Sequence, residues 1–175
     1  LIGRVRHEDD IASIASLGDK QDNEIYITQG YSVYGIGVGI YHYHVSGKSG
    51  ITPDGGLLIS LGAGDDYLEL LNKSTADVTH FGAVGDGTTD DTVAVQAAFD
   101  SGYSKFPKPA TSFLVSSIEL NNNQIVIGPG RKQVCVVGDG SDTVFIPKAN
   151  DGTVRNISFS ELNATVTGAK CFECY

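Results

Sequence analysis

The chain of 175 residues has no methionine, no tryptophan and few basic residues. Its 12 Lys and Arg residues are outnumbered by 21 Asp and Glu residues, which gives a formal net charge of -9 at pH 7. Because nucleic-acid phosphates are bound mainly by Lys and Arg, this balance argues against a nucleic-acid partner. No uninterrupted apolar run approaches the ~20 residues of a membrane-spanning helix, so we also expect no membrane insertion. Without methionine, Leu1 is not a translation start, and we expect the chain to be part of a longer protein.

Cysteine is also scarce, and the three cysteines, Cys135, Cys171 and Cys174, make no disulfide framework. Cys171 and Cys174 form a C-x-x-C pair, which can be redox-active or belong to a zinc site. No second pair accompanies them, so the favoured interpretation is that they are small buried side chains.

Glycine, in contrast, is abundant, with 22 residues, well above a usual share of ~7%. The glycines follow no G-x-y period, so they indicate many tight turns between short strands. The composition therefore predicts a mostly β fold.

The first 76 residues predict one short helix followed by a small antiparallel β unit. Acidic residues precede the segment 11–17, whose apolar side chains fall on one helical face, and Gly18 is suited to end this helix. Strand-like alternation follows at four places, 24–28, 40–45, 55–61 and 65–71.

Residues 77–175 have a different sequence pattern, with one helix followed by short β-type runs. The clearest helix of the chain is predicted at about 89–101, where either Thr89 or Asp90 can cap the N-terminus and Gly102 can end the helix. Short β-type runs separated by turns follow, a pattern that favours a parallel solenoid as readily as a sandwich. These runs are 113–120, 124–130, 133–140, 142–148, 153–162 and 164–168.

The stretch DVTHFGAVGDGTTDDTVAVQAAFDSG, residues 77–102, resembles the opening signature of the pectate-lyase-like superfamily of right-handed parallel β-helices. The residues that carry the resemblance are Phe81, Gly82, Gly85, Asp86, Gly87, Asp90, Asp91, Thr92, Val95, Gln96 and Phe99. The resemblance implies that residues 77–175 begin such a β-helix and that their helix caps its open end. In this cap we expect the side with Val95 and Phe99 to cover the end, while Asp91, Gln96 and Asp100 face water.

Two features were weighed as metal sites. The GDGTTDD segment, residues 85–91, misses the spacing of an EF-hand calcium loop. His42 and His44, two residues apart on a predicted strand, could present two imidazoles to a metal. A third ligand is not evident from the sequence, so an aromatic strand face is favoured. We therefore expect no metal site and no cofactor.

The first 76 residues resemble the module that precedes this signature in bacteriophage tailspikes. The matching features are a short helix, a Gly-rich β unit, a D-G-G turn and an aromatic strand, at 11–17, 35–43, 54–56 and 67–71. The resemblance implies a structural, virion-proximal segment of a homotrimeric tailspike in the virion tail. Such a segment links tail or adaptor proteins to a β-helix that recognises a host surface polysaccharide. The resemblance further implies that the full-length protein depolymerises this polysaccharide.

Two alternatives remain open. One is the N-terminal part of a secreted cellular polysaccharide lyase or glycosidase of the same fold, and the other is a non-enzymatic glycan-binding β-helix. We expect residues 1–175 to contain no complete active site. Glycoside hydrolysis needs two carboxylates about 5–5.5 Å or about 6.5–9.5 Å apart, and the close pair Asp139 and Asp142 has an ordinary turn composition. A lyase would also need a basic residue at the sugar, and the basic pair Arg131 and Lys132 follows a Pro-Gly turn.

Overall fold

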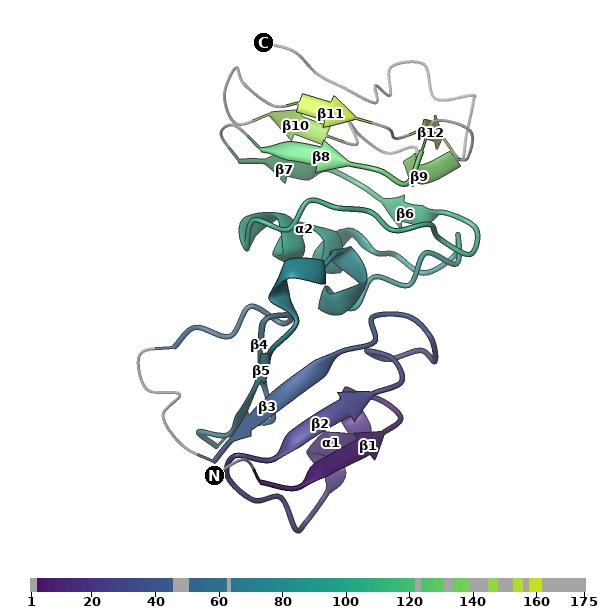
Figure 1. The fold of residues 1–175 in the computed structure, drawn as a ribbon. Helices are drawn as coiled ribbons and strands as arrows, with labels where there is room; N and C mark the ends of the chain where they lie inside the picture. The colour runs from purple at the N-terminus through teal and green to yellow at the C-terminus, as the bar shows by residue number, and fades with distance from the viewer. Residues whose placement is uncertain are drawn as a thin grey trace. The chain divides into compact units, whose positions relative to one another are not determined.

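The computed structural model describes residues 3–45, 51–62, 64–121 and 124–130, together with four strands in the remainder of the chain. The chain divides into two compact units, Leu1–Gly82 and Ala83–Tyr175 (Figure 1). Residues 77–82, which are predicted to belong to the second domain, lie in the first unit. They lie there because the 3-10 helix η2 (Val78–Phe81) is buried and the His80 ring is 3.1 Å from the carbonyl oxygen of Val38.

The first unit is built on a five-stranded mixed sheet with the strand order β1-β2-β3-β5-β4. Its strands are β1 (Val5–Glu8), β2 (Ile25–Thr28), β3 (Ile40–His44), β4 (Leu58–Ser60) and β5 (Tyr67–Leu70), and a short 3-10 helix, η1 (Lys73–Thr75), follows the sheet. The four predicted strand runs correspond to β2 to β5, which pair antiparallel. The prediction of a purely antiparallel unit is wrong, because β1 pairs parallel with β2.

Helix α1 (Ile11–Ser16) connects these two parallel strands. Its N-terminus is capped by Asp10, whose carboxylate accepts the N–H of Ser13 at 2.7 Å. Gly18 directly follows the end of the helix, as predicted, but the helix is closed by Leu17, which is extended and donates its N–H to Ile14. Ile14 is the buried residue of the helix, and it anchors the crossover between β1 and β2.

Buried tyrosines dominate the core of this sheet. Tyr26, Tyr41 and Tyr43 are at most 2% exposed, and the rings of Tyr26 and Tyr43 meet edge-to-face at 6.1 Å. Because successive strand residues point to opposite faces, burial of Tyr41 and Tyr43 places His42 and His44 together on the other face of β3.

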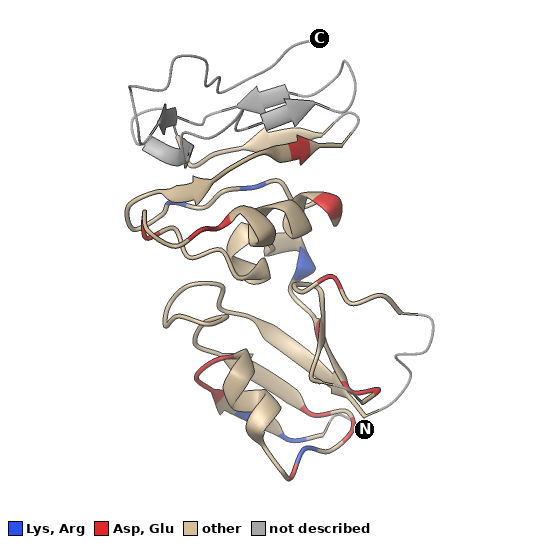
Figure 2. Cartoon of the chain, turned by 180° about the vertical axis from the view of Figure 1, so that it is seen from behind, with Lys and Arg blue, Asp and Glu red and all other residues tan. Residues whose placement is uncertain are grey.

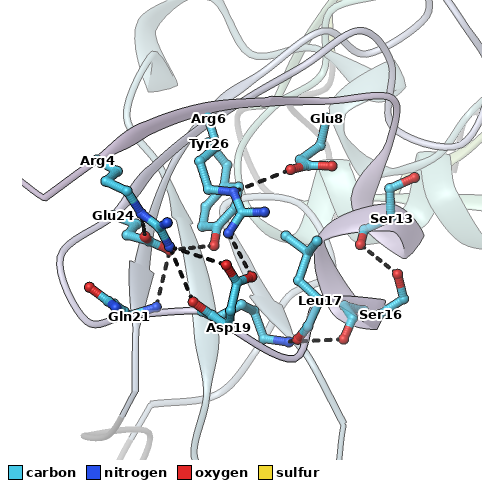
Figure 3. Close-up of polar contacts among 12 residues, drawn as sticks. Arg4, Arg6, Glu8, Ser13, Ser16, Leu17, Asp19, Gln21, Glu24 and Tyr26 are labelled. Carbon is cyan, nitrogen blue, oxygen red and sulfur yellow. Dashed lines mark hydrogen bonds and ion pairs between the residues drawn. The ribbon is translucent and has the colours of Figure 1, made fainter.

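A buried carboxylate, that of Glu24, lies at the start of β2 (Figure 3). Its Oε1 accepts a hydrogen bond from Arg4 Nε at 2.6 Å, while its Oε2 accepts from the Tyr26 hydroxyl at 2.6 Å and the Gln21 N–H at 3.0 Å. Burial by itself raises the pKa of Glu24, but these hydrogen bonds and the charge of Arg4 outweigh it. The pKa of Glu24 therefore lies below its ordinary value.

Arg6 extends this network across β1 (Figure 3). It donates to Asp19 at 2.8 Å, lies 3.4 Å from Glu8, and places its guanidinium 5.8 Å from the centre of the Tyr26 ring. The segment after α1 is thereby tied to β1, which adds side-chain contacts to the parallel pairing of β1 with β2.

The second unit contains helix α2 (Thr92–Asp100) and short strands that pair only in parallel within the described residues. The strands are β6 (Phe113–Val115), β7 (Ile118–Leu120), β8 (Ile125–Ile127), β9 (Val134–Gly138), β10 (Phe145–Pro147), β11 (Thr153–Arg155) and β12 (Ser158–Glu161). Each strand pairs with the third strand after it, so β6 meets β9, β7 meets β10, β8 meets β11 and β9 meets β12. The predicted run 164–168 lies outside the described residues.

Charged residues are interspersed over the described part of the chain (Figure 2). Lys and Arg residues there lie singly or in pairs among acidic ones, as Arg4 and Arg6 do beside Asp19 and Glu24. Among the same residues, no helix has the length and apolar character required to cross a bilayer.

The first prediction concerns Glu24. Replacing it in the variant Glu24→Gln should lower the free energy of unfolding at pH 7 by about 1.5–3 kcal/mol, the range for hydrogen bonds to a charged group. Since the pKa of Glu24 is lowered in the folded chain, the carboxylate stabilises the fold above its unfolded pKa of about 4.3. This stabilisation is lost as the pH falls through the folded pKa.

Urea unfolding at pH 7 and at about pH 3 measures this effect, with Asp9→Asn, a change at an exposed residue of the same unit, as the control. The gap between the unmodified chain and Glu24→Gln should shrink at the lower pH. An equal gap at both pH values would contradict the proposed role of the ionised carboxylate.

Candidate functional site: the capping helix and its signature loop

The N-terminus of α2 is organised by two adjacent aspartates with different tasks. Asp91 is the N-cap residue by backbone position, and Asp90 accepts the N–H of Thr92 at 3.0 Å. The predicted caps were Thr89 or Asp90, so the helix begins slightly later than expected. The Asp91 carboxylate bonds elsewhere, in the loop that precedes the helix.

The C-terminus of α2 is closed by backbone hydrogen bonds. The N–H of Gly102 donates to the carbonyl of Phe99 at 3.0 Å, and the N–H of Tyr103 donates to the carbonyl of Ala98 at 2.8 Å. This is the pair of bonds of a Schellman motif, and Gly102 occupies the left-handed position as the sequence predicts.

Segments on both sides of α2 supply backbone partners for the open edge of β6 and β8. The N–H of Asp91 donates to the carbonyl of Leu114 in β6 at 2.8 Å. At β8, the N–H of Phe106 donates to the carbonyl of Ile127 at 2.8 Å, and the N–H of Ile127 donates to Ser104 at 2.9 Å. Strands β6 and β8, which lie in different sheets, therefore each have a backbone partner in a segment that flanks α2.

A side chain of helix α2 forms hydrogen bonds with the backbone of strand β7, which lies between β6 and β8 in the sequence. Gln96 Oε1 accepts the N–H of Glu119 at 2.8 Å, and Gln96 Nε2 donates to the Glu119 carbonyl at 3.2 Å and to Asp100 at 3.0 Å. Thr92 Oγ1 similarly accepts the N–H of Ser116 at 2.9 Å. The Gln96 amide thus replaces the peptide group of a neighbouring strand. Gln96 is half-buried, so the prediction that it faces water holds only in part.

The apolar side of α2 lies in the core of the second unit. Val95 and Phe99 have no exposed surface, and the ring of Phe99 lies 5.8 Å from Phe106, which in turn is 5.2 Å from Phe113. The strands contribute further residues with at most 2% exposure, namely Val115, Ile118, Leu120 and Val126. The helix therefore covers the strands with both apolar contacts and hydrogen bonds.

Asp91 holds the loop that precedes the helix. It is 1% exposed, and its two carboxylate oxygens accept the N–H groups of Val84 at 2.7 Å and Gly85 at 3.1 Å. Burial raises the pKa of Asp91, although these two hydrogen bonds act in the opposite direction. The prediction that Asp91 faces water is wrong, because the loop needs a buried acceptor for its backbone.

Asp86 and two glycines shape the tip of the same loop. Asp86 Oδ1 accepts the N–H groups of Thr89 at 2.7 Å and Thr88 at 2.8 Å, and these bonds lower the pKa of Asp86. Gly85 and Gly87 have φ values of 69° and 80°, in the left-handed region that disfavours other residues. A Cβ atom on Gly85 would also lie 2.9 Å from a neighbouring aromatic ring.

The first two residues of the signature lie in the other unit. Phe81 ends η2 with 5% exposure, and its ring fills the space beside Gly56, where a Cβ atom would come within 2.4 Å. Gly82 follows in the left-handed conformation and closes η2. The structure therefore brings the signature residues from Gly85 to Phe99 together in one loop and helix, while Phe81 and Gly82 end the first unit.

The carboxylates of the signature are used structurally. Asp86, Asp90 and Asp91 each accept hydrogen bonds from backbone N–H groups of their own loop or helix. Several residues weighed for catalysis, redox chemistry or metal binding lie outside the described side chains, namely Arg131, Lys132, Cys135, Asp139, Asp142, Cys171 and Cys174.

One group of three side chains in the described residues has a geometry suited to a metal ion, and it consists of His42, His44 and Glu69. The sequence identified the two histidines but not Glu69. Glu69 lies directly opposite His42 because β3 and β5 pair in this register. The alternation of 40–45 and 65–71 identified both strands, but it did not specify that they are neighbours.

The second prediction contrasts the two adjacent aspartates. Asp91→Ala leaves the buried N–H of Gly85 and the partly buried N–H of Val84 without their acceptor. Leaving a buried donor unsatisfied costs about 1–3 kcal/mol. We expect a loss of at least about 2 kcal/mol in the free energy of unfolding. Asp90→Ala, which removes one exposed hydrogen bond at the helix start, should cost about 1 kcal/mol. Urea denaturation of both variants measures the contrast, and equal losses would contradict the role of Asp91 as the anchor of the loop.

No family model matches the chain. Among curated proteins, the chain is similar to the preneck appendage protein of Bacillus phage PZA. The two are 28% identical over 98 residues, which cover 53% of this chain and 11% of that protein.

Several solved structures resemble the chain in fold, among them the following two. The gp42 tailspike of Acinetobacter phage vb_AbaP_AS12 matches with a TM-score of 0.71 and 15% identity, covering 94% of this chain and 32% of that chain. WceF of Pantoea stewartii, a glycan biofilm modifying enzyme with a tailspike-like parallel β-helix fold, matches with a TM-score of 0.70 and 18% identity, covering 90% of this chain and 25% of that chain. The chain thus spans no more than about a third of the length of each of these three proteins. Over most of its length, it has a phage tailspike-like structure.

Proposed function

We propose that the chain is the structural and attachment segment of a phage tailspike, a component of the virion tail. In this proposal the first unit is virion-proximal, and the second unit begins the right-handed parallel β-helix of the spike. The observation that carries the proposal is the capping of parallel strands by α2, since a solenoid needs such a cap where its stack begins.

The pairing pattern supports the start of a β-helix. When each strand pairs in parallel with the third strand after it, the chain coils with three strands per turn and stacks each turn on the previous one. The segment that contains α2 lies one step before this stack, because Asp90 bridges Leu114 of β6 and Lys105 bridges Ile127 of β8, both in parallel. Helix α2 thus takes the position that a strand under β7 would have.

The similarity to the preneck appendage protein of a Bacillus phage and to a phage tailspike supports a place in the virion. That relative is named as a preneck appendage protein of a phage, and the matched region covers 53% of this chain. A virion-proximal role for the first unit is consistent with these likenesses and with its resemblance to the module that precedes the β-helix signature in tailspikes.

We further propose that the protein is a homotrimer. The first unit leaves several large apolar side chains exposed, among them Val33, Tyr34, Val38 and Ile40, and Tyr34 is 78% exposed. Identical neighbours arranged around a symmetry axis would bury such side chains. Adaptor proteins of the tail would bind at the first unit, and host surface polysaccharide would bind to turns of the β-helix that follow the described strands.

The likeness to WceF, a glycan biofilm modifying enzyme of the bacterium Pantoea stewartii, supports a second candidate function, that of a cellular enzyme. In this alternative the chain would belong to a cellular polysaccharide lyase or glycosidase. Both candidates share the capped β-helix, and they differ in whether the protein is assembled into a particle.

The third prediction separates these candidates. Antibodies raised against the chain should label the tails of the phage that encodes the full-length protein, as seen by immunogold electron microscopy. Sedimentation of the full-length protein should give the mass of a trimer at micromolar concentration. Label confined to secreted protein, with no particles labelled, would contradict the tailspike proposal and favour the cellular enzyme. A monomer in sedimentation would contradict the trimer.

A further inference from the structure

Three side chains that can bind metals meet on one face of the first sheet. His42 and His44 alternate with the buried tyrosines of β3, so both point away from the tyrosine side. Glu69 of β5 is the direct antiparallel partner of His42, and directly paired residues project from the same face. Two neighbouring strands therefore deliver two imidazoles and one carboxylate to one place.

The distances within this cluster are short. One ligand atom of each residue lies within 4.8 Å of the others, and all three residues are only partly exposed. His44 Nε2 lies 3.4 Å from Glu69 Oε2. This nitrogen is buried, and its contact with Glu69 lacks hydrogen-bond geometry, so it makes no hydrogen bond within the described residues. A buried nitrogen without a hydrogen bond is poorly stabilised, and a ligand at this position would satisfy it.

Neighbouring side chains hold two of the three groups in place. The ring of Tyr67 stacks on His44 with 4.5 Å between centres and 13° between planes. Lys73 Nζ donates to Glu69 Oε1 at 2.7 Å, and the other oxygen, Oε2, lies toward His44. Glu69 can therefore bind a cation through Oε2 while it keeps its contact with Lys73. Supporting partners of this kind orient the ligands in natural metal sites.

We propose that His42, His44 and Glu69 form a binding site for a divalent transition-metal ion of the Zn²⁺ class. Two imidazoles and one carboxylate are a common set of three protein ligands for zinc, and they leave a fourth position open. Calcium and magnesium prefer oxygen ligands, so the two imidazoles disfavour them. Ligand atoms around a tetrahedral zinc ion are roughly 3.4 Å apart, given bonds of about 2.1 Å. The separations in the cluster, which are at most 4.8 Å, must therefore shorten to about 3.4 Å for the three residues to hold the ion.

The proposed ion would join β3 to β5 and so crosslink the middle of the five-stranded sheet. This inference does not depend on the proposed function, because it rests only on contacts within the first unit. It also replaces the expectation, drawn from the sequence, that the two histidines are part of an aromatic strand face without a metal.

The test uses the chain of residues 1–175 without a polyhistidine tag. Isothermal titration with ZnCl₂, after treatment with EDTA and its removal, should give one ion per chain. Both His42→Gln and Glu69→Gln should weaken zinc binding by more than about 10-fold, because loss of a residue that merely orients a ligand already costs about 10–100-fold in metal affinity. The matched control is His7→Gln, which changes an exposed histidine on β1 of the same sheet and should bind zinc as the unmodified chain does.

Far-UV circular dichroism of each variant verifies that the sheet is folded before titration. The two variants act on different strands, so one remains informative if the other fails to fold. Absence of zinc binding by the folded, unmodified chain at millimolar zinc would overturn the proposal. Equal zinc affinity in His42→Gln, Glu69→Gln and His7→Gln would also overturn it, because the ion would then bind elsewhere.

Discussion

The second unit depends on one constraint, which is that the first strands of a parallel stack have an edge with unpaired peptide groups. Such groups are costly when they are left without partners away from water. The segment from Asp90 to Phe106 supplies partners to peptide groups in each of the three first strands, β6, β7 and β8. Its backbone pairs with β6 and β8, and the side chain of Gln96 pairs with both the N–H and the carbonyl of Glu119 in β7. A helix can therefore cover strands that a further strand would otherwise have to cover.

This constraint gives the signature residues a common purpose. Phe99 and Val95 fill the apolar end of the stack, and Gln96 completes the hydrogen bonds of its middle strand. Asp91 is buried in the loop before the helix, where it accepts the N–H groups of that loop and so sets the direction from which the chain enters α2. The acidic residues of this region thus stabilise the beginning of the fold, and the proposed attachment role needs a rigid beginning of this kind.

Much of this arrangement could be predicted from local patterns, and the rest depended on contacts between distant segments. Helix α2, its end at Gly102 and the strands β2 to β5 follow from periodicity and turn residues. Strand β1 was missed because VRHE has only four residues and little buried surface, so its strand state depends on pairing with β2. The burial of Asp91 and the bonds of Gln96 could not be deduced either, since polar side chains of a helix are expected in water until their partners are known. Glu69 could not be assigned to the histidine cluster from the sequence, because its place opposite His42 depends on the register of β3 and β5.

Native-state hydrogen exchange of the Glu119 amide, followed by NMR, tests the central claim most directly. This N–H has the Gln96 side chain as its acceptor, so it should be protected in the unmodified chain. Gln96→Ala should speed its exchange roughly fivefold or more, as loss of about 1 kcal/mol implies. Val93→Ala, a change at a residue of the same helix that is 81% exposed, should leave the exchange rate unchanged. A Glu119 amide that exchanges equally fast in the unmodified chain and in Gln96→Ala would contradict the account that α2 completes the edge of the parallel stack.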